Sequence, residues 1–525
     1  MSFVKDLDMP LLGLPGGQSH TLRDFCGGVH AFGGIGSGKT SGLHVLAGAF
    51  LRGGMGGLTT AVKSEDVDLW RRYAAEHGRG NSLVLFDENE GFNFLDYELA
   101  RQGMDGIGTV TEMLMHLLEI AKRASPTASQ RGGEEFWQDA MRQTLRRLIL
   151  PLYAAAGSLS VADMTRSLST APTNLKEPTD PEWQRRSFFY KVMDAAARYP
   201  RVPMSRATLA DTIRYWAEEW PAIPDKTRGN IVITITAALD RFRHGRLQRA
   251  FCGKTTIVPE LSFHGGIIVL AMPTLVWNED GGIAQQLFKY MWQRAVLSRN
   301  SLAPKHRERP VFLWCDEAQE TVNSYDFEFQ SLCRASKCCS VYITQSLPTY
   351  YAKMGGDSPR DAAEALVGKF MNHLYFTNLC PCTNEYASRV IGKVVMRRGN
   401  YNSGSSKSVN VGMSAGENEN DGSSSGHGFS WSSSSGHGGG GGNANYGHTS
   451  GSGNNWASNR GRGTSHNVSQ GYHESMEAAI EAGYFASGLK TGGPLNGNEI
   501  TAIWFQAGRT FRASGHSWFL ARFRQ

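Results

Sequence analysis

The sequence lacks an apolar run long enough to cross a lipid bilayer, and its first residues do not form a signal peptide. We therefore expect a cytoplasmic protein. Any association with the inner membrane is expected to come through a partner.

Net charge and cysteine content are both low for a chain of 525 residues. The net charge of +6 permits contact with nucleic acid but does not require it. Most of the 8 cysteines lie in apolar or helical stretches, which favours reduced core residues over disulfides. Cys338, Cys339, Cys380 and Cys382 could be combined into a four-thiolate metal site, but their spacings are not those of a zinc knuckle.

Residues 33–40, Gly-Gly-Ile-Gly-Ser-Gly-Lys-Thr, match the complete pattern of a phosphate-binding loop and are called the phosphate loop below. Residues 28–32 can form a short buried strand before it, and residues 41–51 have helical spacing after it. This context disfavours the alternative of a glycine-rich turn that matches by chance. The predicted nucleotide-binding residues are Gly33, Gly34, Ile35, Gly36, Ser37, Gly38, Lys39 and Thr40.

The loop predicts specific chemistry for its last two residues. Lys39 is expected to lie against the β- and γ-phosphates of ATP, and the hydroxyl of Thr40 is expected to bind Mg²⁺. A second site follows the apolar run at 310–315, which ends abruptly in Asp316 and Glu317. We expect Asp316 to hold the Mg²⁺ shell and Glu317 to polarise the attacking water. A plain strand end is the alternative, but together with the phosphate loop the pattern favours an ATPase.

Strand and helix patterns alternate along much of the chain and predict an α/β fold with a parallel sheet. About 276 positions separate Thr40 from Asp316, more than a minimal nucleotide-binding core needs, so an all-helical insertion is expected. The expected strands lie at 28–32, 57–63, 82–86, 266–273, 310–315, 339–345, 374–377, 500–506 and 517–523.

The predicted domain organisation has five parts. Residues 401–470 are rich in Gly, Ser, Asn and His, and cannot bury enough apolar surface to offset the entropy of ordering, so a disordered insert is expected. The nucleotide-binding domain is expected in two sections, 1–104 and 246–400, with the helical insertion (105–245) between them. The disordered insert (401–470) and the closing strands (471–525) follow.

The order of the motifs resembles the TraG/TraD-like type IV coupling ATPases of conjugation and type IV secretion, within the FtsK–HerA group of hexameric DNA pumps. The resemblance covers about 15–400 and 472–525. Besides the phosphate loop, it rests on Lys63-Ser64-Glu65-Asp66, the run 91–96 after Phe86-Asp87, Glu135-Phe136-Trp137, Asp316-Glu317, Thr344-Gln345-Ser346, Thr383-Asn384-Glu385 and Ile391-Gly392.

The resemblance implies a RecA-like core that works as a homo-hexamer and translocates DNA, single-stranded and without sequence preference, or a relaxase–DNA complex. It also implies a membrane secretion channel as partner. Arg334 matches the arginine that this family projects into the neighbouring subunit's nucleotide, and Gln345 matches the glutamine that senses the γ-phosphate. A surface arginine and a polar strand cap are the plain alternatives for these two residues.

Two departures from the family pattern keep a second function open. Coupling proteins usually carry N-terminal membrane-spanning helices, which this sequence does not show. Family members often have an acid two residues before the equivalent of Lys63, where this chain has Ala61. The alternative is a soluble regulatory or substrate-recognition ATPase of a secretion or defence complex that does not pump DNA. A kinase is disfavoured, because kinases lack the distant Asp-Glu strand.

Overall fold

The computed structural model describes residues 3–124, 134–354, 358–412 and 459–525. The chain forms two compact units. The first unit contains 1–391 and 481–525, and the second contains 392–480. Each unit is described by itself below.

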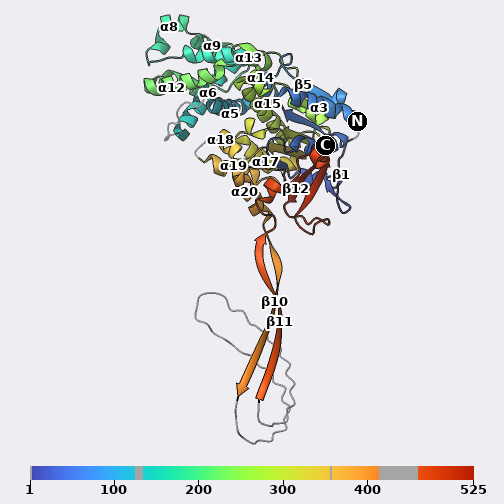
Figure 1. The fold of residues 1–525 in the computed structure, drawn as a ribbon. Coiled ribbons are helices and arrows are strands. Elements are labelled where there is room, and N and C mark those ends of the chain that lie inside the picture. The colour runs from blue at the N-terminus through green and yellow to red at the C-terminus, as the bar shows by residue number, and fades with distance from the viewer. Residues whose placement is uncertain (1–2, 125–133, 355–357, 413–458) are drawn as a thin grey trace. The chain divides into compact units, whose positions relative to one another are not determined.

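A nine-stranded sheet forms the centre of the first unit, in the order β13-β12-β9-β3-β8-β7-β4-β6-β5 (Figure 1). The seven strands from β9 to β5 are parallel, whereas β12 is antiparallel to both β9 and β13. The strands are β3 Val29–Phe32, β4 Gly56–Thr60, β5 Leu83–Phe86, β6 Ile267–Leu270, β7 Val311–Cys315, β8 Cys338–Thr344, β9 Asn372–Tyr375, β12 Glu499–Gln506 and β13 Trp518–Arg524. All nine strands expected from the sequence are therefore confirmed.

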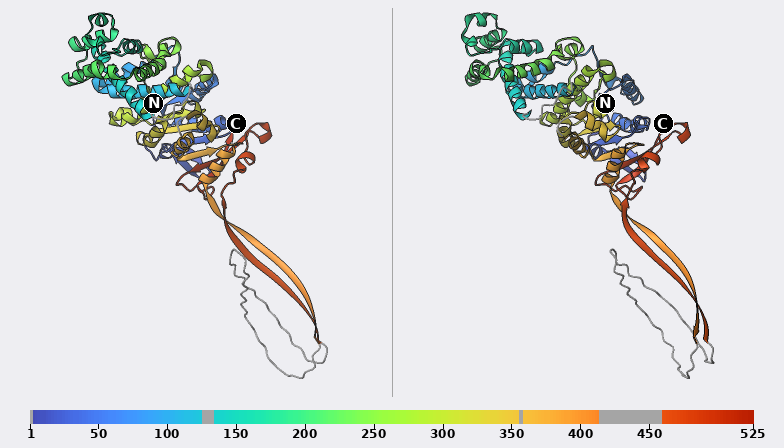
Figure 2. Two further views of the ribbon diagram at one scale, coloured as in Figure 1. Left: turned by 90° about the vertical axis from the view of Figure 1, so that its left-hand side faces the viewer. Right: turned by 60° about the vertical axis from the view of Figure 1, so that its left-hand side comes forward.

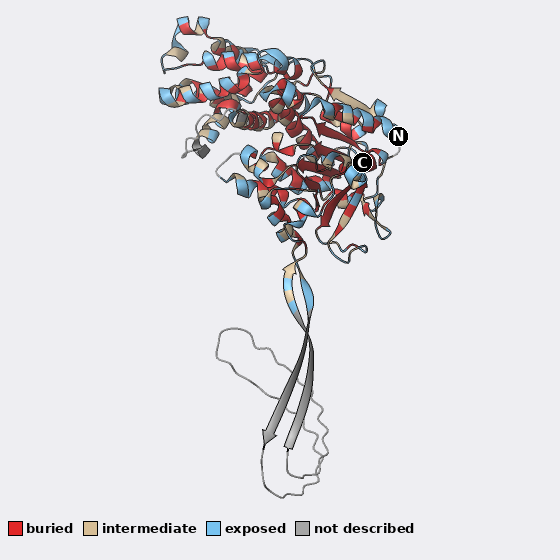
Figure 3. Cartoon of the chain, viewed as in Figure 1, coloured by how far each residue is buried: buried red, intermediate tan, exposed pale blue. Residues whose placement is uncertain are grey.

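The central strands are buried along their whole length because helices cover both faces of a parallel sheet. Every residue of β3, β7 and β8 is buried, and Figure 3 shows this burial concentrated in the sheet. The helices of the nucleotide-binding part are α1 Leu22–Phe25, α2 Lys39–Arg52, α3 Ser64–Glu76, α4 Phe94–Gln102, α14 Thr274–Trp277, α15 Glu279–Ser298, α16 Pro304–Arg307, α17 Tyr325–Leu332, α18 Leu347–Met354, α19 Pro359–Val367, α20 Pro381–Ile391 and α21 Tyr484–Ser487.

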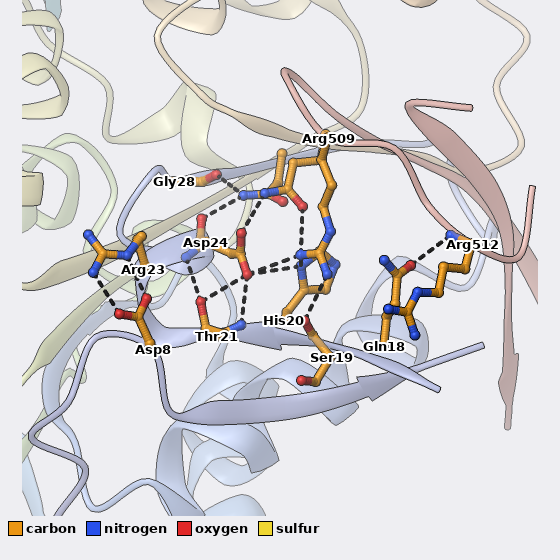
Figure 4. A network of polar contacts seen from close by, with 12 residues as sticks. Asp8, Gln18, Ser19, His20, Thr21, Arg23, Asp24, Gly28, Arg509 and Arg512 are labelled. Carbon is orange, nitrogen blue, oxygen red and sulfur yellow. Dashed lines mark hydrogen bonds and ion pairs between the residues drawn. The ribbon is translucent and has the colours of Figure 1, made fainter. Parts of the chain in front are cut away.

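A small hairpin near the N-terminus was not anticipated from the sequence. It consists of β1 Pro10–Leu14 and β2 Gln18–Thr21. A polar network joins it to the loop between β12 and β13 (Figure 4). Arg509 donates hydrogen bonds to Asp24 Oδ2 at 3.0 Å and to the carbonyl oxygen of Ser19 at 2.8 Å. The network therefore joins sequence segments almost 500 residues apart within the first unit.

Helices fill the sequence between β5 and β6, and both views of Figure 2 show them gathered at one end of the first unit. After α4 they extend from Gly106 to Cys252, a little beyond the end of the expected insertion at 105–245. They are α5 Gly106–Ala124, α6 Glu134–Ala156, α7 Val161–Ser169, α8 Pro181–Arg186, α9 Phe188–Arg198, α10 Arg206–Arg214, α11 Trp220–Ala222, α12 Asp225–Asp240 and α13 Gly245–Cys252, with a π-helical turn at Tyr215–Glu219.

The helical insertion and the sheet belong to one compact unit because α5 packs against α15 and lies close to the start of α17. The His116 ring on α5 stacks on Tyr290 of α15, with ring centroids 4.3 Å apart. Ser324, just before α17, donates a hydrogen bond to Glu119 of α5 at 2.8 Å. Among the described residues, no single helix is both long and apolar enough to cross a membrane; α6 and α7 reach that composition only as a pair bent by 118°.

The second unit contains a long antiparallel pair, β10 Lys393–Gly412 and β11 Asn459–Ala478. Residues 401–412 and 459–470, the two ends of the segment expected to be a disordered insert, belong to these strands. Pairing between strands uses backbone groups and needs no apolar side chains, so composition alone did not reveal it. The remainder of that prediction, 413–458, lies outside the described residues.

Candidate functional site

The phosphate loop joins the carboxyl end of β3 to the first residue of α2, as its sequence predicts. Gly36 and Gly38 have φ angles of 71° and 83°, a left-handed conformation that glycine adopts without strain. The Lys39 ammonium group donates hydrogen bonds to the carbonyl oxygens of Gly33 and Gly34 at 2.6 and 2.9 Å. The lysine is thus held over the loop, where a phosphate chain would replace these contacts.

The loop has the features that a phosphate group and a metal ion require. Ser37 is buried, and its hydroxyl oxygen has no hydrogen-bond partner among the described residues. Thr40 is exposed at the start of α2, so its hydroxyl is free to bind Mg²⁺. The positive end of the α2 dipole lies at the same point and favours an anion. These residues therefore fit ATP with Mg²⁺, which would supply the phosphates and the charge-neutralising cation.

The two acids lie directly after β7, and β8 separates β7 from the phosphate-loop strand β3. Glu317 has a φ of 45°, in the left-handed region that a residue with a side chain adopts only at a cost. Its backbone N–H donates a hydrogen bond to Asp316 Oδ1 at 2.9 Å. This tight turn places both carboxyl groups at the carboxyl edge of the sheet, close to Lys39, whose charge both of them influence.

Three side chains surround the Glu317 carboxylate, one from the turn that directly follows it and two from other segments. Gln319 Nε2 donates a hydrogen bond to Oε2 at 2.8 Å, and Gln345 Nε2 lies 3.4 Å from both carboxylate oxygens. The Lys63 ammonium group lies 3.9 Å from Oε1. Thr344 in turn donates a hydrogen bond to Gln319 Oε1 at 2.6 Å. The carboxylate is therefore held in place, as a group that orients a water molecule must be.

The site concentrates negative charge away from water. Burial, followed by the nearby carboxylates of Asp66 and Glu317, raises the pKa of Asp316 to about 6. Burial also raises the pKa of Asp66. Burial lowers the pKa of Lys39, although Glu317 and Asp316 act in the opposite direction. Clustered acids of this kind are a favourable environment for a divalent cation.

The segment after β4 contributes Asp66 and Tyr73 to the surroundings of the site, and the sequence did not predict a role for either residue. Asp66 accepts hydrogen bonds from the backbone N–H groups of Val62 and Lys63 at 2.9 and 2.8 Å, which fixes the start of α3. Tyr73 on the same helix donates a hydrogen bond to the carbonyl oxygen of Thr40 at 3.5 Å. Position 61 carries no acid, and Asp66, three residues after Lys63, is the acid of this segment whose charge acts on Asp316.

A buried ion pair holds the chain that follows Glu317. Lys289 of α15 donates hydrogen bonds to Asp326 and to the carbonyl oxygen of Thr321, both at 2.6 Å. Both charged side chains are fully buried. Tyr342 of β8 also donates to Asp326 at 2.6 Å. The segment from Thr321 to Asp326 is therefore held by α15 and β8, two elements that are distant from each other in sequence. The Asp-Glu motif alone does not predict these contacts.

Gln345 is joined to a further segment of the site by its backbone. Asn378 donates a hydrogen bond to the carbonyl oxygen of Gln345 at 2.8 Å, and Asn384 of α20 donates to the carbonyl oxygen of Asn378 at 2.8 Å. The Thr383 hydroxyl accepts a hydrogen bond from Leu347 N at 3.0 Å. The Thr-Asn pair that carried part of the family resemblance thus supports the predicted γ-phosphate sensor.

Arg334 lies at the opposite edge of the sheet from the phosphate loop. It belongs to a 3₁₀ turn that leads into the amino end of β8, and its side chain is exposed. The structure therefore does not bring Arg334 to the site of its own subunit. Arg389, in the last turn of α20, is also exposed. Whether Arg334 acts on a neighbouring subunit stays a prediction.

The cysteines do not form the four-thiolate site considered above, and all eight are free thiols. Cys338 and Cys339 begin β8 at the amino edge of the sheet. Cys380 and Cys382 lie beyond the carboxyl end of β9, next to the phosphate-loop strand. The two pairs are therefore at opposite edges, because all three strands run in the same direction.

A cavity of about 1120 Å³ lies away from the phosphate loop, between α5, α6, α12, α15 and α17. Its charged lining is at least partly self-neutralised, since Arg142 donates a hydrogen bond to Glu112 at 2.8 Å. The phosphate loop itself is an open surface at the sheet edge, with Ile35 exposed by 90%.

Comparisons with known proteins agree with this geometry. Residues 310–437 match the family described as the TraM recognition site of TraD and TraG. The fold is similar to that of the bacterial conjugative coupling protein TrwBdeltaN70 in its unbound monoclinic form, with a TM-score of 0.54 and 12% identity over 98% of this chain and 88% of that one. No curated protein is significantly similar in sequence.

Two further solved structures are of plasmid coupling protein TrwB with nucleotides. One contains the non-hydrolysable ATP analogue ADPNP, with a TM-score of 0.46 and 15% identity over 74% of this chain and 79% of that one. The other contains ADP and Mg²⁺, with a TM-score of 0.45 at the same identity and coverage. The family match and the TrwBdeltaN70 fold together confirm what the sequence predicts: the chain has a RecA-like P-loop fold and is similar to the TraG/TraD-like type IV coupling proteins.

Proposed function

We propose that this chain is an ATP-hydrolysing motor of conjugation or type IV secretion that translocates DNA or a relaxase–DNA complex. The observation that carries this proposal is that the nucleotide-binding motifs all lie at one edge of the sheet. The phosphate loop, Asp316, Glu317 and Gln345 follow the carboxyl ends of three adjacent strands, β3, β7 and β8. The matched TraD and TraG family supports the biological setting.

The site assigns a role to each residue when ATP and Mg²⁺ are bound. The loop N–H groups and Lys39 bind and orient the phosphates, while Thr40 and Asp316 are the protein ligands for the cation. Glu317 accepts a proton from the attacking water, which its contacts with Gln319 and Gln345 help to orient. Protein motors use this hydrolysis to change the contacts between subunits.

The position of Arg334 favours a ring of identical subunits. A residue at the amino edge cannot reach the phosphate loop of its own subunit, but it can reach that of a neighbour in a head-to-tail ring. Arg334 lines a depression of about 490 Å³ together with Lys337 and with Arg23, whose charge is paired with Asp8. A guanidinium group supplied by a neighbour suits the charge that develops on the transferred phosphoryl group.

Exposed apolar side chains at the carboxyl edge also support subunit contact. Ile35 is exposed by 90%, Leu275 by 71% and Leu379 by 81%. They follow β3, β6 and β9, whose carboxyl ends lie at the same edge of the sheet. Single exposed apolar residues are normal on a protein surface, but Ile35 and Leu379 follow the adjacent strands β3 and β9 at the nucleotide site, which favours a surface that a partner covers. We propose a homo-hexamer that works in the cytoplasm and contacts a membrane secretion channel through a partner.

The proposal is tested by measuring ATP turnover with and without single-stranded and double-stranded DNA, alongside the mass of the assembly with a non-hydrolysable ATP analogue. We expect single-stranded DNA to raise turnover without sequence preference, because a pump grips phosphates rather than base edges. We also expect the analogue to drive assembly into a ring. Lys39→Ala is the control that should abolish turnover while the protein stays folded.

The same assay separates the alternative function. Turnover that DNA does not change, in a protein that forms rings with the analogue, would favour a regulatory or substrate-recognition ATPase. Turnover in soluble Lys39→Ala protein equal to that of the wild type would refute the nucleotide site itself. A monomer under all conditions, with normal turnover, would refute the role proposed for Arg334.

A further inference from the structure

Two histidines and a glutamate meet on the surface between α2 and α3, outside the nucleotide site. His44 lies on α2, one turn after Thr40, whereas Glu76 and His77 lie at the end of α3. One nitrogen or oxygen atom from each of the three side chains lies within 4.8 Å of the other two. His44 and Glu76 already touch, with Nε2 and Oε2 separated by 2.9 Å. Nothing in the ATPase chemistry uses these three residues.

The packing around the cluster brings the histidine side chains together. The His44 ring stacks on Tyr73, with centroids 4.5 Å apart, which limits the orientations of the imidazole. His77 Nε2 is buried against α2 and has no hydrogen-bond partner among the described residues. A Cβ atom at Gly48 would lie 2.7 Å from this nitrogen, so the His77 ring packs directly against the backbone of the helix and a larger residue at position 48 would displace it. A buried nitrogen without a partner is costly unless something binds it.

We propose that His44, Glu76 and His77 form a binding site for a divalent transition-metal ion, with Zn²⁺ as the best fit. Two imidazoles and one carboxylate are a ligand set that zinc prefers, with bonds of about 2.0–2.2 Å and one position left for water. In a tetrahedral ion of this size the ligand atoms are about 3.4 Å apart. The separation of 2.9 Å between His44 and Glu76 and the limit of 4.8 Å for the whole set require only small side-chain rotations.

Occupation of this site would link α3 to the helix that begins with Lys39 and Thr40. An ion held by both helices restrains the movement of α2 relative to α3, where Tyr73 already contacts the carbonyl oxygen of Thr40. An ion that binds the folded chain and not the unfolded chain raises the stability of the folded chain. The exposed Arg52 lies one turn beyond Gly48 and its charge acts on His77, so it opposes a cation there.

The test is a titration of untagged, nucleotide-free protein with ZnCl₂ by calorimetry, followed by Co²⁺ absorption spectroscopy. We expect one Zn²⁺ per chain, a melting temperature that rises on binding, and visible Co²⁺ bands typical of tetrahedral nitrogen and oxygen ligands. His44→Gln and His77→Gln should each weaken binding by more than about tenfold, because even outer-shell partners of a metal contribute 10- to 100-fold. Arg52→Gln should strengthen it.

The matched control is His264→Gln. His264 forms another close histidine pair, with its Nε2 atom 3.1 Å from Nδ1 of His306, but no third ligand completes that pair among the described residues. Binding should be unchanged in this variant. Binding lost in His264→Gln but retained in His44→Gln would overturn the proposal. Co²⁺–thiolate charge-transfer bands in the wild-type protein would also overturn it, and this measurement does not depend on the folding of any variant. Absence of Zn²⁺ binding to the wild type would refute it outright.

Discussion

Replacement of Asp316 by asparagine should stabilise the nucleotide-free protein while removing its response to Mg²⁺. The carboxylate is withdrawn from water next to Asp66 and Glu317, which raises its pKa from the ordinary 3.8 to about 6. Because one pKa unit corresponds to about 1.4 kcal/mol, the ionised group costs the folded state about 3 kcal/mol at neutral pH. Asparagine removes that charge but keeps the oxygen that accepts the hydrogen bond from Glu317 N.

The sign of this effect gives it a defined pH window. An acid whose pKa is raised on folding destabilises the native state most where it is ionised in both states, above about pH 6, and not at all well below pH 4. The gain from Asp316→Asn should therefore be largest at pH 7.5 and should shrink as the pH falls from about 6 towards 4. Urea unfolding of both proteins at several pH values measures this difference, with Asp240→Asn as an exposed control.

Binding of Mg²⁺ and ATP should reverse the order of stability of the wild type and Asp316→Asn. Mg²⁺ with ATP neutralises the buried acids of the wild type and stabilises it by mass action, whereas Asp316→Asn lacks a ligand for the ion. The wild type should thus melt above the variant once Mg²⁺ and ATP are present. A variant that is less stable than the wild type at pH 7.5 without nucleotide would refute the charge argument. Equal Mg²⁺ stabilisation of both proteins would remove Asp316 from the metal site.

Four further changes test other parts of the structure. Glu317→Gln should bind ATP but hydrolyse it about 100-fold or more slowly, since an amide does not accept the proton; lost binding with a normal rate per bound site would contradict this. Gln319→Ala should lower kcat more than it changes KM, because it removes the 2.8 Å contact that positions the carboxylate; unchanged kcat would exclude the positioning role. Arg334→Ala should lower ring turnover about 1,000-fold, and mixing it with Lys39→Ala should restore some activity, whereas verified mixed rings that stay inactive would exclude a contribution in trans. Replacing 393–479 by a short turn should leave the melting temperature of the first unit within a few degrees, since Ala479 N bonds to the Gly392 carbonyl oxygen at 2.9 Å, and a collapse measured by circular dichroism would contradict this.

The local elements could be predicted because their signals are short in sequence. The phosphate loop needs glycines, a lysine and a hydroxyl residue in consecutive positions, so its pattern is complete in eight residues. The nine strands of the sheet were recognised from short apolar runs, since a strand buried on both faces carries few polar residues. The helical insertion was recognised from apolar residues at three- and four-residue steps.

The strand pair β10–β11 and the N-terminal hairpin are two elements that amino-acid composition does not reveal. The ladder between β10 and β11 is built from backbone hydrogen bonds, which glycine and serine form as readily as apolar residues do. The hairpin of β1 and β2 is short and only partly buried, and much of its support comes from Arg509 at the far end of the sequence. Neither arrangement leaves a periodic pattern in the chain.

The sequence by itself determined which chemistry to expect of this protein, because the groups expected to bind phosphate and metal are carried by contiguous motifs. The tertiary structure alone decided how these groups act together. Burial at the sheet edge raises the pKa of Asp316, and Gln345 reaches Glu317 only because β7 and β8 are neighbours. The strand order also places Arg334 at the edge of the sheet opposite the phosphate loop of its own chain. Distances and desolvation depend on which strands are adjacent, and adjacency is a property of the folded sheet.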